Sequence, residues 1–143
     1  MIYIREACEA DISAIWELNA IEMGYQYPLD ATTQKVKMLL NSKADKIYVA
    51  VLEHTVVGYV HANNYDVIYA PHMKNIMGIA VLSNYKRCGI GRALLQQVEQ
   101  WGRSTGAAGV RLTSGMMRTE AHVFYHSCGY AGDKEQLNLK KMF

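Results

Sequence analysis

The chain has 143 residues, of which 50% are hydrophobic and 20% are charged, and its formal net charge is +2 at pH 7. This balance is typical of a soluble globular protein, and so small a charge argues against nucleic acid or an anionic membrane as partners. Three cysteines without a C-x-x-C pattern (Cys8, Cys88 and Cys128) argue against a disulfide scaffold or a thiolate zinc site. Because no apolar run approaches the roughly 20 residues that span a bilayer and the charged start is unlike a signal peptide, we expect a cytoplasmic location.

The first part of the chain predicts one strand and two helices. Residues 2–6 alternate between apolar and polar side chains, as a half-buried strand does. Apolar residues then recur at helical spacing after Asp11, a candidate cap, until Gly24 ends the pattern. Asp30 and Thr32 are candidate caps of a second helix.

Three strands are expected next. The segments 47–52 and 56–62 are rich in β-branched residues, and the short link 53–55 between them predicts a hairpin. A less regular stretch over 63–74 leads into the run 76–81, which is apolar without alternation. Such a run is typical of a strand that is buried on both faces.

The last part of the chain predicts two more helices and further strands. Residues 89–104 have the most regular amphipathic pattern of the chain. A strand is expected at 110–113, a helix at 119–128, and one or two short strands near Tyr130 and at 137–142. Since no repeat or linker interrupts this order, we expect one domain over residues 1–143, with a mixed α/β sheet and helices on both faces.

A glycine-rich turn before the helix at 89–104 is the most informative feature. Gly89 and Gly91 allow the backbone to approach a ligand closely and to adopt angles that other residues avoid. The first turn of the helix presents N–H groups without internal partners, which favours an anion. Positive charge around the same point comes from Lys86, Arg87 and Arg92. These features indicate a diphosphate site, although an isolated G-x-G also occurs in turns whose glycines serve only chain geometry.

Two nucleotide-binding motifs do not fit this turn. A P-loop requires Lys and then Ser or Thr after its last glycine, where this chain has Arg92 and Ala93. A dinucleotide-binding motif requires a third glycine at the position of Leu94, and its strand lies much earlier in a chain. Both motifs are therefore excluded.

The segment from Ile79 to Leu95 resembles the acetyl-coenzyme A signature of the GNAT superfamily of N-acetyltransferases. That signature is a strand ending in valine, followed by [QR]-x-x-G-x-[GA] at the start of a helix. Here it reads VLSNYKRCGIGRALL from Val81 onward. Lys86 stands where the family usually has Gln or Arg, and Cys88 replaces a frequent basic residue, but the backbone amides remain. The order of elements fits the family as well, so the resemblance covers nearly the whole chain.

The resemblance implies the GNAT fold, an α/β (α+β) architecture with a central, mixed and mostly antiparallel sheet of six to seven strands and about four helices. It implies acetyl-coenzyme A (acetyl-CoA) as co-substrate, and no metal. The backbone of Ile79, Ala80 and Val81 would lie beside the pantetheine arm, with one N–H group facing the thioester carbonyl. The pyrophosphate would be held by Lys86, Arg87, Cys88, Gly89, Ile90, Gly91 and Arg92.

A second segment, from Ala121 to Tyr130, is similar to the family's A-x-x-F-Y-x-x-x-G-[FY] pattern at each specified position. In the family, the tyrosine that corresponds to Tyr125 commonly lies near the coenzyme sulfur as general acid. The resemblance implies that catalytic role here, and a phenol with a reference pKa of about 10 is protonated at neutral pH. Without that context, a tyrosine on an inward helix face is more often a core residue.

The general base is not identified by the resemblance. Many members of the family have Glu or His near the position of Asn75, and an asparagine cannot take a proton. Glu22, His61 and His72 are candidate substitutes, although each is also compatible with an ordinary surface or structural role. Cys88 would allow a covalent acetyl-enzyme. Because the family's loop grips phosphates away from the thioester, direct transfer is expected instead.

We therefore expect an acyltransferase that moves an acetyl group from acetyl-CoA directly to a primary amine of a small molecule or peptide. The alternatives are an inactive acetyl-CoA-binding sensor and a phosphate-binding domain unrelated to acetyl transfer. The acceptor side would comprise the first two helices, the loop between them and the last hairpin. Aromatic rings there come from Tyr25, Tyr27, Tyr65 and Tyr69, which could instead cover apolar surface or the interface of a possible homodimer. Few acidic residues lie in this region, so no cleft for a polycation is expected.

Overall fold

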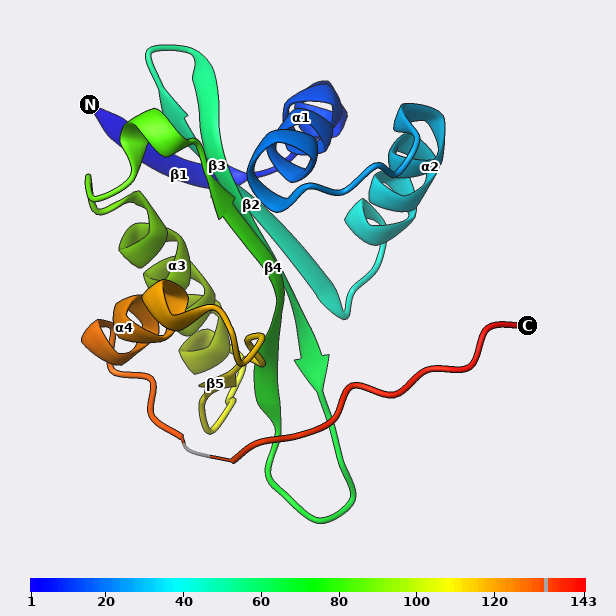
Figure 1. Cartoon of the computed structure of the whole chain (residues 1–143), viewed down its shortest axis with the longest axis vertical. Helices are drawn as coiled ribbons and strands as arrows, with labels where there is room; N and C mark the ends of the chain where they lie inside the picture. The colour runs from blue at the N-terminus through cyan, green and yellow to red at the C-terminus, as the bar shows by residue number, and fades with distance from the viewer. Residues whose placement is uncertain (133) are drawn as a thin grey trace. The chain divides into compact units, whose positions relative to one another are not determined.

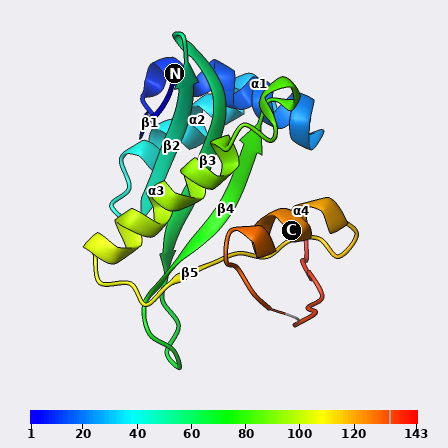
Figure 2. The same ribbon diagram turned by 90° about the vertical axis from the view of Figure 1, so that its left-hand side faces the viewer.

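The computed structural model describes residues 1–132 and 134–143, which divide into two compact units, Met1–Leu112 and Thr113–Phe143. In the first unit, five strands form one sheet in the order β1-β2-β3-β4-β5. Two helices, α1 and α2, cover one face of this sheet, and α3 covers the other (Figure 1, Figure 2). The second unit contains α4. The expectation of a single acetyltransferase domain over the whole chain stays a prediction.

The described residues confirm the predicted fold class, a mixed α/β structure with a mostly antiparallel sheet. All neighbouring strands are antiparallel except β4 and β5, which are parallel. The strands are β1 (Ile2–Glu6), β2 (Asp45–Leu52), β3 (Thr55–Tyr65), β4 (Met73–Val81) and β5 (Val110–Arg111). The helices are α1 (Ile12–Met23), α2 (Leu29–Leu40), α3 (Ile90–Ser104) and α4 (Thr119–Ser127), with 3-10 turns η1 (Glu9–Asp11) and η2 (Ser83–Tyr85). None of these helices is long and apolar enough to cross a membrane.

The sheet is smaller than expected, with five strands instead of six to seven. No described residue after Arg111 is in a strand, so the short strands predicted near Tyr130 and at 137–142 are wrong. Leu137 and Leu139 are 86% and 83% exposed, and an apolar alternation makes a strand only where a neighbour supplies a hydrogen-bonding edge. The strand expected at 110–113 is reduced to the two residues of β5.

Strand β4 contains an irregularity that the sequence pattern does not predict. Gly78 pairs with His61 and Ile76 pairs with Ala62, so Met77 is an extra residue between two paired positions. This is a β-bulge, which locally bends a strand and re-aims its side chains. The expectation that the whole run 76–81 is buried is wrong for this reason, since Met77 is 57% exposed.

The predicted cap of α1 is confirmed in its position, whereas the caps predicted for α2 are wrong. Asp11 holds the N-cap position of α1, but its carboxylate accepts hydrogen bonds from the Cys8 N–H (2.8 Å) and from the guanidinium of Arg5 (2.7 and 2.9 Å). Helix α2 begins at Leu29, ahead of both predicted caps, with Pro28 at its N-cap. A proline at a helix boundary fits this arrangement because its missing N–H would have no helical partner there.

The elements on either side of the sheet are held by apolar packing. Val49 and Val51 of β2, with Tyr59 of β3, pack in one buried cluster with residues of α1 and α2. On the other face, α3 buries the stripe Ile90, Leu94, Leu95, Val98. Gly58 of β3 permits the close approach of α3, because a Cβ at this position would lie 3.3 Å from side-chain atoms of both Ile90 and Leu94. This packing fixes the start of α3 against the end of β4.

Candidate active site

The edge of β4 that faces away from β3 has no neighbouring strand over more than half of its length. β5 pairs with β4 only at Lys74 and Asn75, and no other described strand pairs with that edge. The Leu82 N–H donates to the Val57 carbonyl at 2.9 Å, which sets the alternation along β4. Since backbone groups of alternate residues face the same neighbour, those of Ile79 and Val81 face away from β3. The predicted pantetheine contacts are therefore available at Ile79 and Val81, whereas Ala80 bonds to β3.

The loop before α3 has an unusual backbone. Arg87 and Gly89 both have positive φ angles, 67° and 82°, and Gly89 is the N-cap of α3. The first helical hydrogen bond is donated by the Ala93 N–H to the Gly89 carbonyl. The N–H groups of Ile90 and Gly91 lie before this bond and have no acceptor within the helix. A left-handed conformation costs a non-glycine residue roughly 1–2 kcal/mol, and such strain is concentrated at ligand sites.

Charged and polar side chains of this loop surround the start of α3. Lys86, Arg87 and Cys88 are exposed, and Arg92 is exposed in the first helical turn. The Cys88 thiol donates weakly to the Lys86 carbonyl at 3.8 Å. The structure thus brings the predicted loop residues together around one helix N-terminus, where backbone N–H groups and positive charge favour an anion.

Glu22, a candidate base, has another role. Its carboxylate accepts hydrogen bonds from the Ser83 hydroxyl (2.7 Å) and backbone N–H (3.1 Å), and lies 3.6 Å from the Lys86 amino group. The Ser83 hydroxyl, with the adjacent Lys86, holds the pKa of Glu22 below its ordinary value. A carboxylate that is engaged and less basic than usual is a poor base. Glu22 instead ties α1 to the loop, a contact over 61 residues that no local pattern predicts.

A pocket of about 580 Å³ lies within the first unit, between α1 and α2 and the strands β2 to β4. This volume is in the range of small-molecule sites. Four aromatic side chains contribute to its wall: Trp16, Tyr25, Tyr27 and Tyr59. The bulge residue Met77 and its neighbour Gly78 also line it, so the pocket adjoins the open edge of β4. The remaining lining residues are Ile15, Asn19, Gln26, Thr32, Lys35, Val36, Leu39, Ile47 and His61.

The wall formed by the loop between α1 and α2 is ordered by hydrogen bonds. The indole N–H of Trp16 donates to the Tyr27 carbonyl at 2.8 Å. Gly24 ends α1 with a φ of 71°, as predicted. Deeper in the pocket, the Tyr59 hydroxyl donates to the Asn19 side-chain oxygen at 2.5 Å, and burial raises the pKa of Tyr59. Sequence patterns do not single out Tyr59, because its place in β3 is typical of a core residue.

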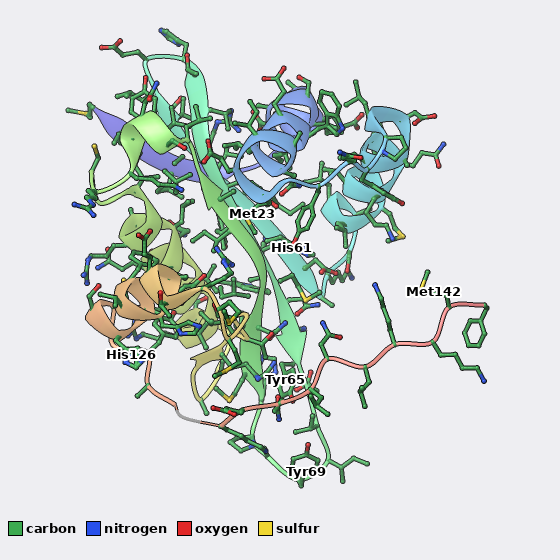
Figure 3. The ribbon with its side chains drawn as sticks, viewed as in Figure 1. Met23, His61, Tyr65, Tyr69, His126 and Met142 are labelled. Carbon is green, nitrogen blue, oxygen red and sulfur yellow. The ribbon has the colours of Figure 1, made fainter. Side chains whose placement is uncertain are left out.

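His61 is the candidate base that lines the pocket. It lies on the side of the sheet that α1 and α2 cover, opposite Gly78 in the β3–β4 register (Figure 3). Its Nε2 is 2.8 Å from Oδ1 of Asp45, and the Ser42 hydroxyl donates to Oδ2 of Asp45 at 2.7 Å. A carboxylate can only accept, so Nε2 carries the hydrogen and Nδ1 is the proton acceptor of the neutral ring.

Asn75 and His72 do not line this pocket. The Asn75 side-chain oxygen accepts a hydrogen bond of 2.6 Å from Arg111, which links β4 to β5. His72 lies 2.7 Å from Asp66 and 3.0 Å from the amino group of the buried Lys74. Of the three candidate bases Glu22, His61 and His72, His61 is the one among the described residues that lines the pocket.

Two of the four predicted aromatic residues lie elsewhere. Tyr25 and Tyr27 line the pocket, but the Tyr65 ring packs under the guanidinium of Arg111 at 4.1 Å. Tyr69 is 87% exposed in the connection between β3 and β4 (Figure 3). The prediction that Tyr65 and Tyr69 belong to the same region as Tyr25 and Tyr27 is wrong, because long strands carry them to the far end of the hairpin.

In the second unit, Tyr125 is a buried residue of α4. Its ring lies 5.3 Å from that of Phe124 and 6.3 Å from that of Tyr130. Burial raises the pKa of Tyr125, so the hydroxyl keeps its proton across the neutral range. The helix stops at Cys128, and Gly129 follows with a φ of 92°, the left-handed position that its place after the apolar pattern predicts.

Comparison with known proteins gives a family match. The family model described as "Acetyltransferase (GNAT) family" matches residues 12–130. No curated protein matches. Among solved structures, a transcriptional regulator from Bacillus halodurans superposes with a TM-score of 0.88 at 21% identity, over 99% of this chain and 100% of the other. The aminoglycoside 6'-N-acetyltransferase AAC(6')-Ih from Acinetobacter baumannii gives 0.88 at 19% identity, over 100% and 99%. AAC(6')-Iy with the bisubstrate analogue CoA-S-monomethyl-acetylneamine gives 0.89 at 16%, over 100% and 99%.

Proposed function

The chain belongs to the GNAT family of acetyltransferases, and from this premise we propose that it transfers the acetyl group of acetyl-CoA directly to a primary amine. One observation carries the proposal: the open edge of β4 at Ile79 and Val81 leads to the anion-binding loop at one end and to the pocket at the other. Structural neighbours were solved with CoA or a CoA bisubstrate analogue, which supports the same co-substrate.

The chain's own groups fit acetyl-CoA. Backbone groups of Ile79 and Val81 would bind the pantetheine amides as an added strand does. The N–H groups at the start of α3, with Lys86, Arg87 and Arg92 around them, would hold the phosphates. An N–H group on the open edge of β4 would stabilise the negative charge that develops on the thioester oxygen.

We propose roles in the proton chemistry for two side chains, His61 from its place in the pocket and Tyr125 from its place in the family motif. His61 takes a proton from the bound ammonium through Nδ1, and the neutral amine then attacks the thioester carbonyl. As the carbon–sulfur bond breaks, Tyr125 gives its proton to the departing thiolate. One N–C bond forms and one S–C bond breaks. The ammonium nitrogen loses two protons: one leaves through His61, and the second, released after the attack, replaces the proton that Tyr125 gave to the thiolate. If His61 is the base, the asparagine at position 75 does not leave the site without a base and is no longer a reason to favour an inactive sensor.

Binding of acetyl-CoA is the first test. Calorimetric titration of the full chain should give a dissociation constant on the order of micromolar or tighter, and 3'-phospho-ADP should bind more weakly because it lacks the pantetheine arm. Absence of measurable acetyl-CoA binding would contradict both the enzyme and the sensor.

A further inference from the structure

The described residues that line the pocket include no carboxylate. Among the fifteen residues that line it in the described part of the chain, Lys35 is the one with a permanent charge, and it is positive. Asp45 lies behind His61 and is occupied by that ring and by Ser42. A ligand with several ammonium groups would therefore bury positive charges without counter-charges, which is strongly unfavourable.

The same lining is well suited to an apolar ligand body. Ile15, Val36, Leu39 and Ile47 present aliphatic surface, while Trp16 and Tyr59 add ring faces from α1 and β3. An amine bound against this lining loses part of its hydration without gaining a carboxylate partner there, and this desolvation lowers the pKa of its ammonium form. The pocket would thereby increase the fraction of neutral amine, and His61 provides one acceptor for one proton.

We infer that this pocket is the acceptor site and that it takes a primary amine with a single amino group on an apolar, aromatic or branched aliphatic body. The inference rests on the proposed function and narrows it. It separates this chain from the structural neighbours whose names identify them as aminoglycoside acetyltransferases, since aminoglycosides carry several ammonium groups.

Two amines of similar shape test whether the acceptor site prefers a single amino group. 4-Methylbenzylamine and 1,4-bis(aminomethyl)benzene differ by one ammonium group, and sisomicin serves as the polycation. The chain has two tryptophans, one of which is Trp16 in the pocket, so amine binding to the CoA-loaded protein can be followed by tryptophan fluorescence. Trp16→Phe identifies the part of the signal that comes from the pocket.

The monoamine should bind at least roughly tenfold more tightly than the diamine and sisomicin, because the second charge stays uncompensated. Lys35→Glu places a carboxylate at the pocket; Lys35 is exposed, so folding should be preserved. This variant should reduce the preference severalfold. Equal or tighter binding of the diamine or sisomicin, or a preference that Lys35→Glu leaves unchanged, would overturn the inference. Thiol release from acetyl-CoA with any amine separately reports on the proposed function, so the two can fail independently.

Discussion

His61 carries the sharpest prediction among single residues. His61→Gln keeps a polar side chain that can still bond to Asp45 but cannot take a proton. Removal of a general base typically costs about 10²–10⁴-fold, so kcat/KM at pH 7 should fall by that order. The deficit should shrink as pH rises, because more of the amine then arrives without its proton. Steady-state rates over a pH series measure both effects.

Asp45→Asn is the matched positioning variant. An amide in place of the carboxylate weakens the bond to Nε2 and allows the ring to adopt the wrong tautomer. We expect an intermediate loss of kcat with a shifted pH profile and little change in KM for acetyl-CoA. A wild-type pH profile and kcat in His61→Gln would rule out the assigned base.

Tyr125 is the corresponding test for the acid. Tyr125→Phe keeps the ring that packs against Phe124 and Tyr130 and removes only the hydroxyl. The expected result is a decrease in kcat of roughly 10²-fold, since the thiolate must leave without a proton donor. Calorimetry should show unchanged affinity for acetyl-CoA. If kcat were unaffected at every pH, the acid would have to be another group.

Sequence reasoning at this scale succeeds where a residue's conformation is local. The positive φ of Gly89 and Gly129 follows from glycines placed beside helix ends. Local sequence patterns cannot select the general base among Glu22, His61 and His72. The selection depends on partners such as Ser83 and Asp45, which lie 61 and 16 residues away in the chain. The hydrogen bond between Asn75 and Arg111 likewise joins residues that are far apart in the sequence, so local patterns do not predict it.

At the scale of elements, the open edge of β4 makes a prediction with its own control. Val81→Pro removes an N–H that faces away from β3, so the sheet keeps its ladder, whereas Ala80→Pro removes an N–H that faces β3. Val81→Pro should weaken acetyl-CoA binding by about tenfold, roughly the loss of one good hydrogen bond, with a smaller effect on stability.

Ala80→Pro should show a large loss of stability, on the order of 3 kcal/mol, because a ladder hydrogen bond is lost in the middle of the sheet. Calorimetry and urea unfolding of both variants distinguish the two outcomes. Acetyl-CoA affinity that is unaltered in Val81→Pro would show that the edge does not bind the pantetheine arm.

The elements that local patterns describe are those the structure confirms. The hairpin of β2 and β3 closes through Glu53 and His54, whose φ angles of 48° and 69° suit a tight two-residue turn. The stripe on α3 is also a local pattern. The bulge at Met77 depends on pairing with β3, and the expected strand at 137–142 lacks a neighbouring edge among the described residues. Neither the bulge nor the absence of that strand can be predicted from the periodicity of apolar residues.

For the whole molecule, acid stability should depend on Asp11. Burial alone would raise the pKa of Asp11, but hydrogen bonds from Arg5 and from the Cys8 N–H outweigh it and hold the pKa below the ordinary 3.8. A lowered pKa stabilises the folded state above the unfolded pKa, and this contribution is lost as pH falls through the folded pKa. Asp11→Asn should therefore be about 2 kcal/mol less stable than wild type near pH 7.

Urea unfolding at a series of pH values measures this difference. The gap between wild type and Asp11→Asn should be constant from pH 7 to about 5 and then narrow below the ordinary carboxyl pKa of about 4. A gap that stays the same down to the acid transition would mean that the bond between Arg5 and Asp11 does not contribute through charge.

The central claim is that this chain moves an acetyl group from acetyl-CoA to an amine, and release of free CoA thiol measures it most directly. The full chain is mixed with acetyl-CoA and, in separate reactions, with apolar monoamines, diamines and sisomicin. The account predicts thiol release that requires an amine, is fastest with an apolar monoamine and is strongly reduced in His61→Gln. No amine-dependent release with any acceptor, in protein that binds acetyl-CoA, would contradict it and leave a binding module in its place.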